Sequence, residues 1–426
     1  MSTIPPGGNG GSGGSGGDGS CGPFARCDGV CVDLAADPKH CGDCDNACPG
    51  ASLCIAGGCA CAGGTGSLCG GACVDTTKDP YNCGACGHAC DLQAGFACSG
   101  GVCAFACGFG LLDCNADTSD GCEVDTTSDP KNCGVCGHVC EGGAGCSAGK
   151  CDPVSIADAP DGVLDIAVDE QRVFWTTPSG KLFAAPLAGG SVTTLDSGGN
   201  PVAIALDEGN VYATDHNAGA ILKVAKDGTG ASVLTSAPGV TAIATSGSRV
   251  YFAGNAGQAW SLKSVLTNGG APDMLASGAG GINGLAVDPG GIYLAADGPT
   301  GGAILTVPLG GGTAQTLAGD QSSPRRIVAQ NGEIYWVEYG NCQVHRMSLN
   351  GGGPATLFAG NLGDNACTNI AVDATDVYAA GFIGLMRVPI AGGPLEILAL
   401  AQTIGVAVSK DHVFFGQGGA LVKMEK

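Results

Sequence analysis

Residues 152–426 contain short apolar runs, rich in Val, Ile and Ala, that alternate with glycine-containing turns. Such runs between turn signals predict β-strands. One strand pattern, typified by Ile-Ala-Val-Asp, recurs seven times at intervals of 36 to 43 residues. Its copies are residues 166–169, 204–207, 243–246, 285–288, 327–330, 370–373 and 406–409. This regular period predicts a repeat protein.

Each copy continues with three further strands: one with an aromatic residue, one ending in a glycine hairpin, and a fourth. Four strands in about forty residues are typical of a β-propeller blade. The seventh copy stops after its third strand at 420–426, whereas residues 153–160 parallel the fourth-strand segment 231–238. We therefore predict an all-β, seven-bladed propeller, closed by an N-terminal strand that pairs residues near 154 with residues near 422.

The segments IAVDEQRVFWTT and VAIALDEGNVYATD, with a hairpin of the type VPLGGG, resemble the YWTD/NHL-like propeller superfamily. The resemblance covers about 270 residues and supports the predicted fold. It says little about function, because that superfamily includes adhesive modules, receptors and a few lactonases and lyases.

The amino-terminal third differs, since 24 of the 26 cysteines lie between Cys21 and Cys151. We expect a flexible Gly/Ser-rich tether at 1–20, a cysteine-rich module of three repeats at 21–151, and the propeller at 152–426. The repeats span 21–59, 61–103 and 107–151, each with eight cysteines. These are Cys21, Cys27, Cys31, Cys41, Cys44, Cys48, Cys54 and Cys59; Cys61, Cys69, Cys73, Cys83, Cys86, Cys90, Cys98 and Cys103; and Cys107, Cys114, Cys122, Cys133, Cys136, Cys140, Cys146 and Cys151.

Each repeat has few large apolar side chains, so we expect four disulfides, rather than a core, to stabilise it, with little regular secondary structure. Such density persists in an oxidising compartment. Eight cysteines allow 105 pairings, and the sequence does not select one. Zinc is the alternative, because His88 and His138 each follow a Cys-x2-Cys pair, but the first repeat has Asn46 at this position.

Each repeat also contains an Asp-Pro pair, which opens turns: Asp37-Pro38, Asp79-Pro80 and Asp129-Pro130. Calcium is the one cofactor that the acidic turns leave open. Its best candidates are Asp113, Asn115, Asp117 and Asp120, although this loop lacks the glycine that an EF-hand requires.

The segments CGGACVDTTKDPYNCGACGHAC (69–90) and CEVDTTSDPKNCGVCGHVC (122–140) resemble the repeat of stigma-specific-protein-like domains, which also occurs in secreted bacterial surface proteins. The resemblance covers about 130 residues and implies an extracellular, non-catalytic module. It does not imply a ligand.

The net charge is −21 and no stretch is basic, so nucleic acid is not an expected partner. No apolar run is long enough to span a membrane. Residues 1–20 lack the apolar core of a signal peptide. We therefore expect export to depend on a leader that these residues do not include, which could also carry a lipid-attachment cysteine.

In a propeller, the loops that enter the innermost strands and those between second and third strands share one face around the central channel, the default ligand surface. Our candidates there are Asp165, Asp215, His216, Asn283, Asp297, Arg325, Arg326, Glu338, Tyr339 and Asn369. A catalytic cation would need several converging oxygens, and the two arginines oppose one. The remaining cysteines, Cys342 and Cys367, are predicted to pair on this face.

The leading hypothesis is therefore an exported bacterial cell-surface or secreted protein that binds a protein or a glycan, with no catalytic residues. A metal-dependent hydrolase or lyase of the lactonase kind is one alternative. A structural subunit of an extracellular assembly is the other.

Overall fold

The computed structural model describes residues 21–426 except residues 51, 62–65, 93–94, 109, 118–121, 197–198, 299–300, 340–341 and 359–366. It divides the chain into two compact units. The first comprises residues 1–140 and 145–150, and the second comprises residues 141–144 and 151–426. The sequence had assigned residues 141–144 to the cysteine-rich module. The tether expected at 1–20 lies outside the described residues.

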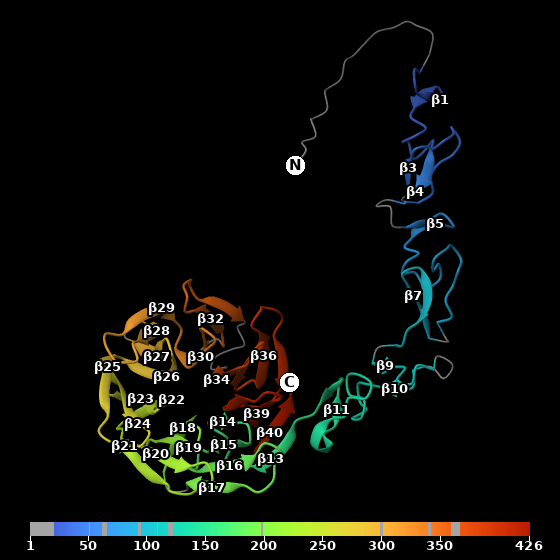
Figure 1. Cartoon of the computed structure of the whole chain (residues 1–426). Helices are drawn as coiled ribbons and strands as arrows, with labels where there is room; N and C mark the ends of the chain where they lie inside the picture. The colour runs from blue at the N-terminus through green and yellow to red at the C-terminus, as the bar shows by residue number, and fades with distance from the viewer. Residues whose placement is uncertain are drawn as a thin grey trace. The chain divides into compact units, whose positions relative to one another are not determined.

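The second unit consists of seven four-stranded antiparallel sheets, which form a ring of blades (Figure 1). In strand order they are β14 (Ile166–Val168), β15 (Arg172–Thr176), β16 (Leu182–Pro186), β17 (Thr193–Asp196); β18 (Pro201–Leu206), β19 (Asn210–Asp215), β20 (Ala220–Ala225), β21 (Ser232–Ser236); β22 (Val240–Ser246), β23 (Arg249–Ala256), β24 (Ala259–Leu266), β25 (Asp273–Ala279); β26 (Gly281–Asp288), β27 (Gly291–Gly298), β28 (Gly301–Val307), β29 (Gln315–Gln321); β30 (Pro324–Gln330), β31 (Glu333–Glu338), β32 (Val344–Ser348), β33 (Ala355–Phe358); β34 (Cys367–Val372), β35 (Asp376–Gly381), β36 (Leu385–Pro389), β37 (Glu396–Ala399); and β38 (Val406–Val408), β39 (His412–Gln417), β40 (Ala420–Glu425) with β13 (Val154–Asp158). The predicted fold is confirmed.

The ring closes inside its seventh sheet. Strand β13 pairs antiparallel with β40, so that Val154 lies opposite Lys423 and Ser155 lies opposite Val422. This is the pairing that the truncated seventh repeat predicts. It removes two exposed sheet edges, which would otherwise be open to pairing with another chain.

The core lies between neighbouring blades. One cluster combines Ile304 of the fourth blade with Ile327 and Trp336 of the fifth, and each of these side chains is buried. Another cluster joins the closing strand to the first blade through Ile156 and Trp175. Each sheet therefore buries both of its faces, which explains the nearly continuous apolar runs in the sequence.

The recurring aspartates shape the turn after the innermost strand. Asp207 accepts hydrogen bonds from the backbone N–H groups of Gly209 and Asn210, and Asp373 does the same for Thr375 and Asp376. The Tyr212 hydroxyl donates to Asp207 over 2.6 Å. Burial opposes ionisation of Asp207, but these hydrogen bonds outweigh it and lower its pKa. These recurring aspartates therefore have a structural role in the turns of the blades.

The first unit has only short hairpins and one 3-10 turn among its described residues and the short segment that follows Cys140. The strands are β1 (Ala25–Cys27), β2 (Val30–Val32), β3 (Leu53–Ile55), β4 (Gly58–Ala60), β5 (Ser67–Cys69), β6 (Ala72–Val74), β7 (Phe96–Ser99), β8 (Val102–Phe105), β9 (Leu111–Leu112), β10 (Val124–Asp125), β11 (Cys146–Ser147) and β12 (Lys150–Cys151), and the turn is η1 (Glu141–Gly143). No helix of the described residues is long and apolar enough to cross a membrane.

Disulfides take the place of a core here, and no cysteine is free. The first repeat joins its cysteines as Cys21–Cys31, Cys27–Cys44, Cys41–Cys54 and Cys48–Cys59. The second repeat has the same connectivity: Cys61–Cys73, Cys69–Cys86, Cys83–Cys98 and Cys90–Cys103. In the third, Cys107–Cys122, Cys114–Cys136 and Cys133–Cys146 follow the same order.

A glycine after the fourth cysteine of each repeat is required by close backbone packing. Gly42 has a φ of +77°, and a Cβ placed there would lie 2.4 Å from the carbonyl oxygen of Gly57. Gly84 and Gly134 meet the turns of their own repeats in the same way. A side chain would therefore strain the backbone and force the terminal hairpin away.

Candidate functional site

The central channel is lined by residues that project from β-bulges. In the innermost strands of blades two to six, the pairing register shifts by one residue, and the residues inside the bulges are Val202 and Ala203, Thr241, Asn283, Arg325 and Arg326, and Thr368. A bulge inserts an unpaired residue and redirects side chains, and bulges are common beside functional sites. The bulges thus direct residues of five innermost strands toward one cavity.

That cavity has a volume of about 330 Å³. Its lining is Leu164, Asp165, Val202, Ala203, Thr241, Asn283, Arg325, Arg326, Tyr339, Thr368, Asn369 and Ile404. Six of the ten sequence-predicted site residues therefore come together here. Five of them enter innermost strands, namely Asp165, Asn283, Arg325, Arg326 and Asn369, and the sixth is Tyr339. Sequence analysis missed the apolar walls, although each of these residues precedes or begins an innermost strand.

Asp165 and Arg326 form an ion pair across the channel. Their side chains approach to 3.2 Å, and Asp165 is almost fully buried, with 4% of its side chain exposed. The carboxylate also accepts the backbone N–H of Ile204 at 2.9 Å and the side-chain amide of Asn369 at 3.3 Å. Asp165 is thus neutralised and hydrogen-bonded within the protein, as a buried carboxylate must be.

Arg325 lies in a different environment. Its guanidinium stacks on the Tyr339 ring, with 4.6 Å between the guanidinium carbon and the ring centroid. One terminal nitrogen donates to the Asn283 side-chain oxygen over 3.1 Å. Asn283 in turn donates to Asp297 at 2.6 Å and to the backbone oxygen of Pro324 at 3.2 Å. The arginine is therefore held in place by an aromatic ring and an amide that is itself fixed.

Four predicted site residues do not line the cavity. Asp297 contacts it only through Asn283, and Asp215 accepts the backbone N–H groups of Asn200, Asn217 and Ala218 in its own loop. His216 lies 3.5 Å from the backbone oxygen of Val240.

Glu338, the fourth of these residues, is buried within its own blade. Its carboxylate accepts the backbone N–H of Ser322 at 2.8 Å and lies 3.7 Å from the His345 ring nitrogen. These contacts give Glu338 a structural role.

Cys342 and Cys367 form a disulfide. Cys342 lies shortly after Tyr339, and Cys367 directly precedes the cavity residues Thr368 and Asn369. The bond thus links the segment that carries the ring under Arg325 to the strand that carries Asn369.

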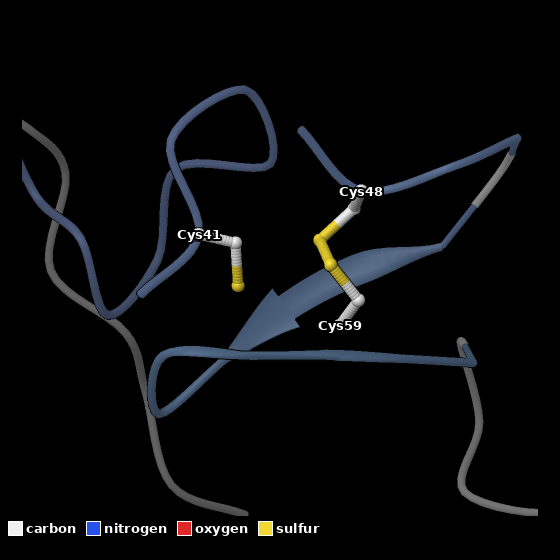
Figure 2. A group of neighbouring side chains, drawn as sticks. All are labelled: Cys41, Cys48 and Cys59. Atoms are coloured by element: carbon white, nitrogen blue, oxygen red, sulfur yellow. A yellow bond between two sulfur atoms is a disulfide. The ribbon is translucent and has the colours of Figure 1, made fainter. Parts of the chain in front are cut away.

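The cysteines of the two candidate zinc motifs are bonded to other cysteines: Cys83 to Cys98, Cys86 to Cys69, Cys133 to Cys146 and Cys136 to Cys114. A group of cysteines in the first repeat is also oxidised. The sulfur atoms of Cys41, Cys48 and Cys59 lie within 4.8 Å of one another (Figure 2). However, Cys48 is bonded to Cys59, and Cys41 is bonded to Cys54. Figure 2 shows the bond between Cys48 and Cys59. A disulfide sulfur is not a thiolate and is a poor zinc ligand.

The motif histidines of the second and third repeats form hydrogen bonds with backbone carbonyl groups. The Nδ1 atom of His88 lies 2.6 Å from the carbonyl oxygen of Cys83, and His138 makes the same contact with Cys133 at 2.7 Å. In the first repeat, Asn46 donates its side-chain amide to Cys41 over 2.6 Å. An N–H donor is therefore what this position supplies in all three repeats.

Calcium binding by the acidic turn around Asn115 stays a prediction. Asn115 uses its side-chain oxygen to accept the backbone N–H of Asp117 at 2.7 Å. Asp120 lies outside the residues that the structure describes. In the channel, the Arg326 contact occupies Asp165, the one carboxylate in the lining.

Comparisons with known proteins identify the fold. No family model and no curated protein sequence match this chain. Its structure is similar to hydrazine synthase from Kuenenia stuttgartiensis (TM-score 0.54, 13% identity), over 63% of this chain and 96% of that one. It is also similar to YCF48 bound to D1 peptide (TM-score 0.51, 14% identity), over 65% and 95%. At these identities the similarity shows the fold alone.

Proposed function

We propose that this chain is an exported bacterial surface or secreted protein that binds another protein through the channel mouth of its propeller. The observation that carries the proposal is the cavity of about 330 Å³, where a fixed arginine and a buried amide stand among apolar walls. Concave sites with apolar walls and a few placed polar groups are typical of binding surfaces.

The disulfides support the extracellular part of the proposal. All cysteines are oxidised, which requires a compartment where disulfides persist. The more specific proposal, a location on a bacterial cell surface, rests on the similarity of the cysteine spacing to stigma-specific-protein-like repeats. In this view the cysteine-rich module acts as a spacer.

The lactonase alternative requires carboxylates that are available to a cation. Asp165 is instead bound to Arg326 and to two hydrogen-bond donors. The channel therefore favours recognition over hydrolysis. YCF48, a protein of similar fold, is bound to the D1 peptide in its solved structure, and a peptide segment would also suit this cavity.

Site-specific photo-crosslinking on the producing cells tests this function. A benzoylphenylalanine replaces Val202, which lines the cavity and is 38% exposed, or Val233, which lies on outer strand β21 of the same blade and is 61% exposed. We expect a discrete protein adduct from position 202 and none from position 233. Adducts of equal yield at both positions, or none from position 202, would contradict the proposal.

A further inference from the structure

We propose that the channel cavity binds a carboxylate of an acidic side chain of the protein partner, held by Arg325. This inference rests on the proposed function and specifies the chemistry that the partner presents. It follows from charge balance, unmet hydrogen bonds and pre-organisation at the cavity.

The charges that line the cavity do not cancel. Two arginines and one carboxylate line it, and Asp165 pairs with Arg326 at 3.2 Å. Arg325 forms no ion pair within the part of the chain that the structure describes. Its described hydrogen bond is to the neutral amide of Asn283. One positive charge is therefore left to interact with a ligand.

Polar atoms beside this charge also lack partners. The Nε atom of Arg325 and the side-chain oxygen of Asn369 are both buried without a hydrogen bond to any described residue. An unsatisfied buried polar group costs about 1–3 kcal/mol. A carboxylate bound through both of its oxygens to Nε and a terminal nitrogen would satisfy the arginine, because the guanidinium fork matches this geometry. A peptide N–H beside that carboxylate would satisfy Asn369.

The arginine is pre-organised for this contact. Tyr339 stacks on one face of the guanidinium, and Asn283 fixes one end of it. Asn283 is itself held by Asp297 and Pro324. Less side-chain entropy is therefore lost on binding than for a solvated arginine.

The size of the cavity favours one side chain over a larger ligand. Its volume of about 330 Å³ lies at the low end of the range for ligand pockets, roughly 300–1,000 Å³. The walls contributed by Leu164, Val202, Ala203 and Ile404 are apolar and offer a sugar ring no hydrogen bonds from side chains. We therefore assign the site to an aspartate or glutamate of a protein rather than to an acidic glycan.

The experiment uses the full chain with ¹⁵N-labelled arginine and follows the Nε–H resonances by NMR. The probes are N-acetyl-aspartyl-methylamide and its neutral counterpart N-acetyl-asparaginyl-methylamide, and R325Q identifies the resonance of Arg325. We expect saturable shifts with the aspartyl probe and at least tenfold weaker binding of the asparaginyl probe. R325Q should weaken aspartyl binding at least tenfold, and R325K severalfold, because an ammonium cannot form the paired contact. In these two variants the Nε–H resonance of Arg326, which lines the same cavity, reports binding.

The matched control is R249Q, because Arg249, at the start of β23, forms an ion pair with the exposed Asp273 at the start of β25. R249Q should leave aspartyl binding unchanged. Equal affinity for the two probes, or unchanged affinity in R325K and R325Q, would overturn the assignment. Tighter binding of a glucuronic acid disaccharide than of the aspartyl probe would also overturn it, in favour of a glycan.

These outcomes are separable from the failure of the proposed function. If the position-202 crosslinker captures a protein but the aspartyl probe does not bind, only the carboxylate assignment fails. If the probe binds but no protein is captured, the cavity is a carboxylate site and the proposed partner class is wrong.

Discussion

The Arg325 guanidinium lies over the Tyr339 ring at 4.6 Å, and the two residues lie at the same open end of the β30–β31 hairpin, where Pro324 is paired with Glu338. Arg325 belongs to the bulge of β30, and Tyr339 follows the end of β31. The bulge directs the Arg325 side chain out of the sheet, and its guanidinium packs on the Tyr339 ring. This contact decides where the uncompensated charge of the channel points.

Replacing Tyr339 with Leu should weaken carboxylate binding without unfolding the propeller. A cation–π contact at a partly exposed site contributes about 0.5–1 kcal/mol, so the aspartyl probe should bind about two- to fivefold more weakly. The measurement is the same NMR titration. Tyr378→Phe is the control, because that ring lies under Lys426 rather than in the channel. An unchanged affinity in Tyr339→Leu would show that the stack does not position Arg325.

The Cys342–Cys367 disulfide should stabilise the propeller. The bond closes a loop with a sequence separation of 25 residues, for which chain entropy predicts about 3.5 kcal/mol. The double variant Cys342→Ser/Cys367→Ser should therefore lower the urea midpoint. Tryptophan fluorescence measures this directly, because Trp175, Trp260 and Trp336, the three tryptophans of the chain, all lie in the propeller.

The matched control for this bond lies in the other unit. Cys41→Ser/Cys54→Ser removes a disulfide of the first repeat and should leave the fluorescence transition in place. A similar shift in both double variants would contradict a local role for the propeller bond.

The closing strand should be as important to stability as any core strand. Ile156 of β13 is 6% exposed and packs in the cluster that joins the seventh and first blades. Ile156→Ala should cost about 2–4 kcal/mol, through lost burial and the cavity left behind. Val233→Ala, at an exposed position, should change the urea midpoint little. Equal effects of the two substitutions would argue that the ring is not held closed by β13.

Much of this fold could be predicted because aligning the repeats with one another shows which strands pair and in which register. The parallel between residues 153–160 and 231–238 was enough to pair Val154 with the last strand, since equivalent positions in a repeat have equivalent partners. The disulfide connectivity could not be predicted, because spacing alone does not bring particular sulfur atoms together.

The sequence could predict which segments lie at the channel mouth, but not which of their side chains face the cavity. Arg325 and Arg326 face the channel because two residues of β30 lie opposite one residue of β31 in a β-bulge. No residue type in the sequence predicts this bulge. Glu338 shows the converse. Alternation along β31 puts it on the same face as the buried Trp336, so it packs inside the blade although it ends a strand at the mouth.

The histidine of the cysteine-rich repeats should be replaceable by asparagine but not by alanine. His88 bonds the Cys83 carbonyl, as Asn46 bonds Cys41 in the first repeat. His88→Ala loses a hydrogen bond of about 1 kcal/mol, which should accelerate exchange of the nearby Cys83 amide about fivefold. That amide donates to the His88 carbonyl over 2.8 Å, so it reports on this turn. His88→Asn should exchange at the native rate, and equal acceleration in both variants would refute the donor role.

The ion pair between Asp373 and Lys426 should make propeller stability depend on acid. Burial alone would raise the pKa of Asp373, but Lys426, at 2.7 Å, and the backbone N–H groups of Thr375 and Asp376 together lower it to about 2. A lowered pKa means that the stabilisation is complete above the unfolded-state value near 3.8 and is lost as the pH falls through about 2. Its size is about 2 kcal/mol for a shift of this extent.

Asp373→Asn should therefore destabilise the propeller at pH 7, and the difference from the native chain should shrink between about pH 4 and pH 2. Urea midpoints from tryptophan fluorescence at pH 7, 4, 3 and 2 measure this. Asp207→Asn is the control: Asp207 makes the same turn bonds but has no lysine ion pair among the described residues, so its variant should show a smaller dependence. A destabilisation by Asp373→Asn that stays constant down to pH 2 would mean that the charge of Asp373, and with it the Lys426 contact, contributes nothing to stability.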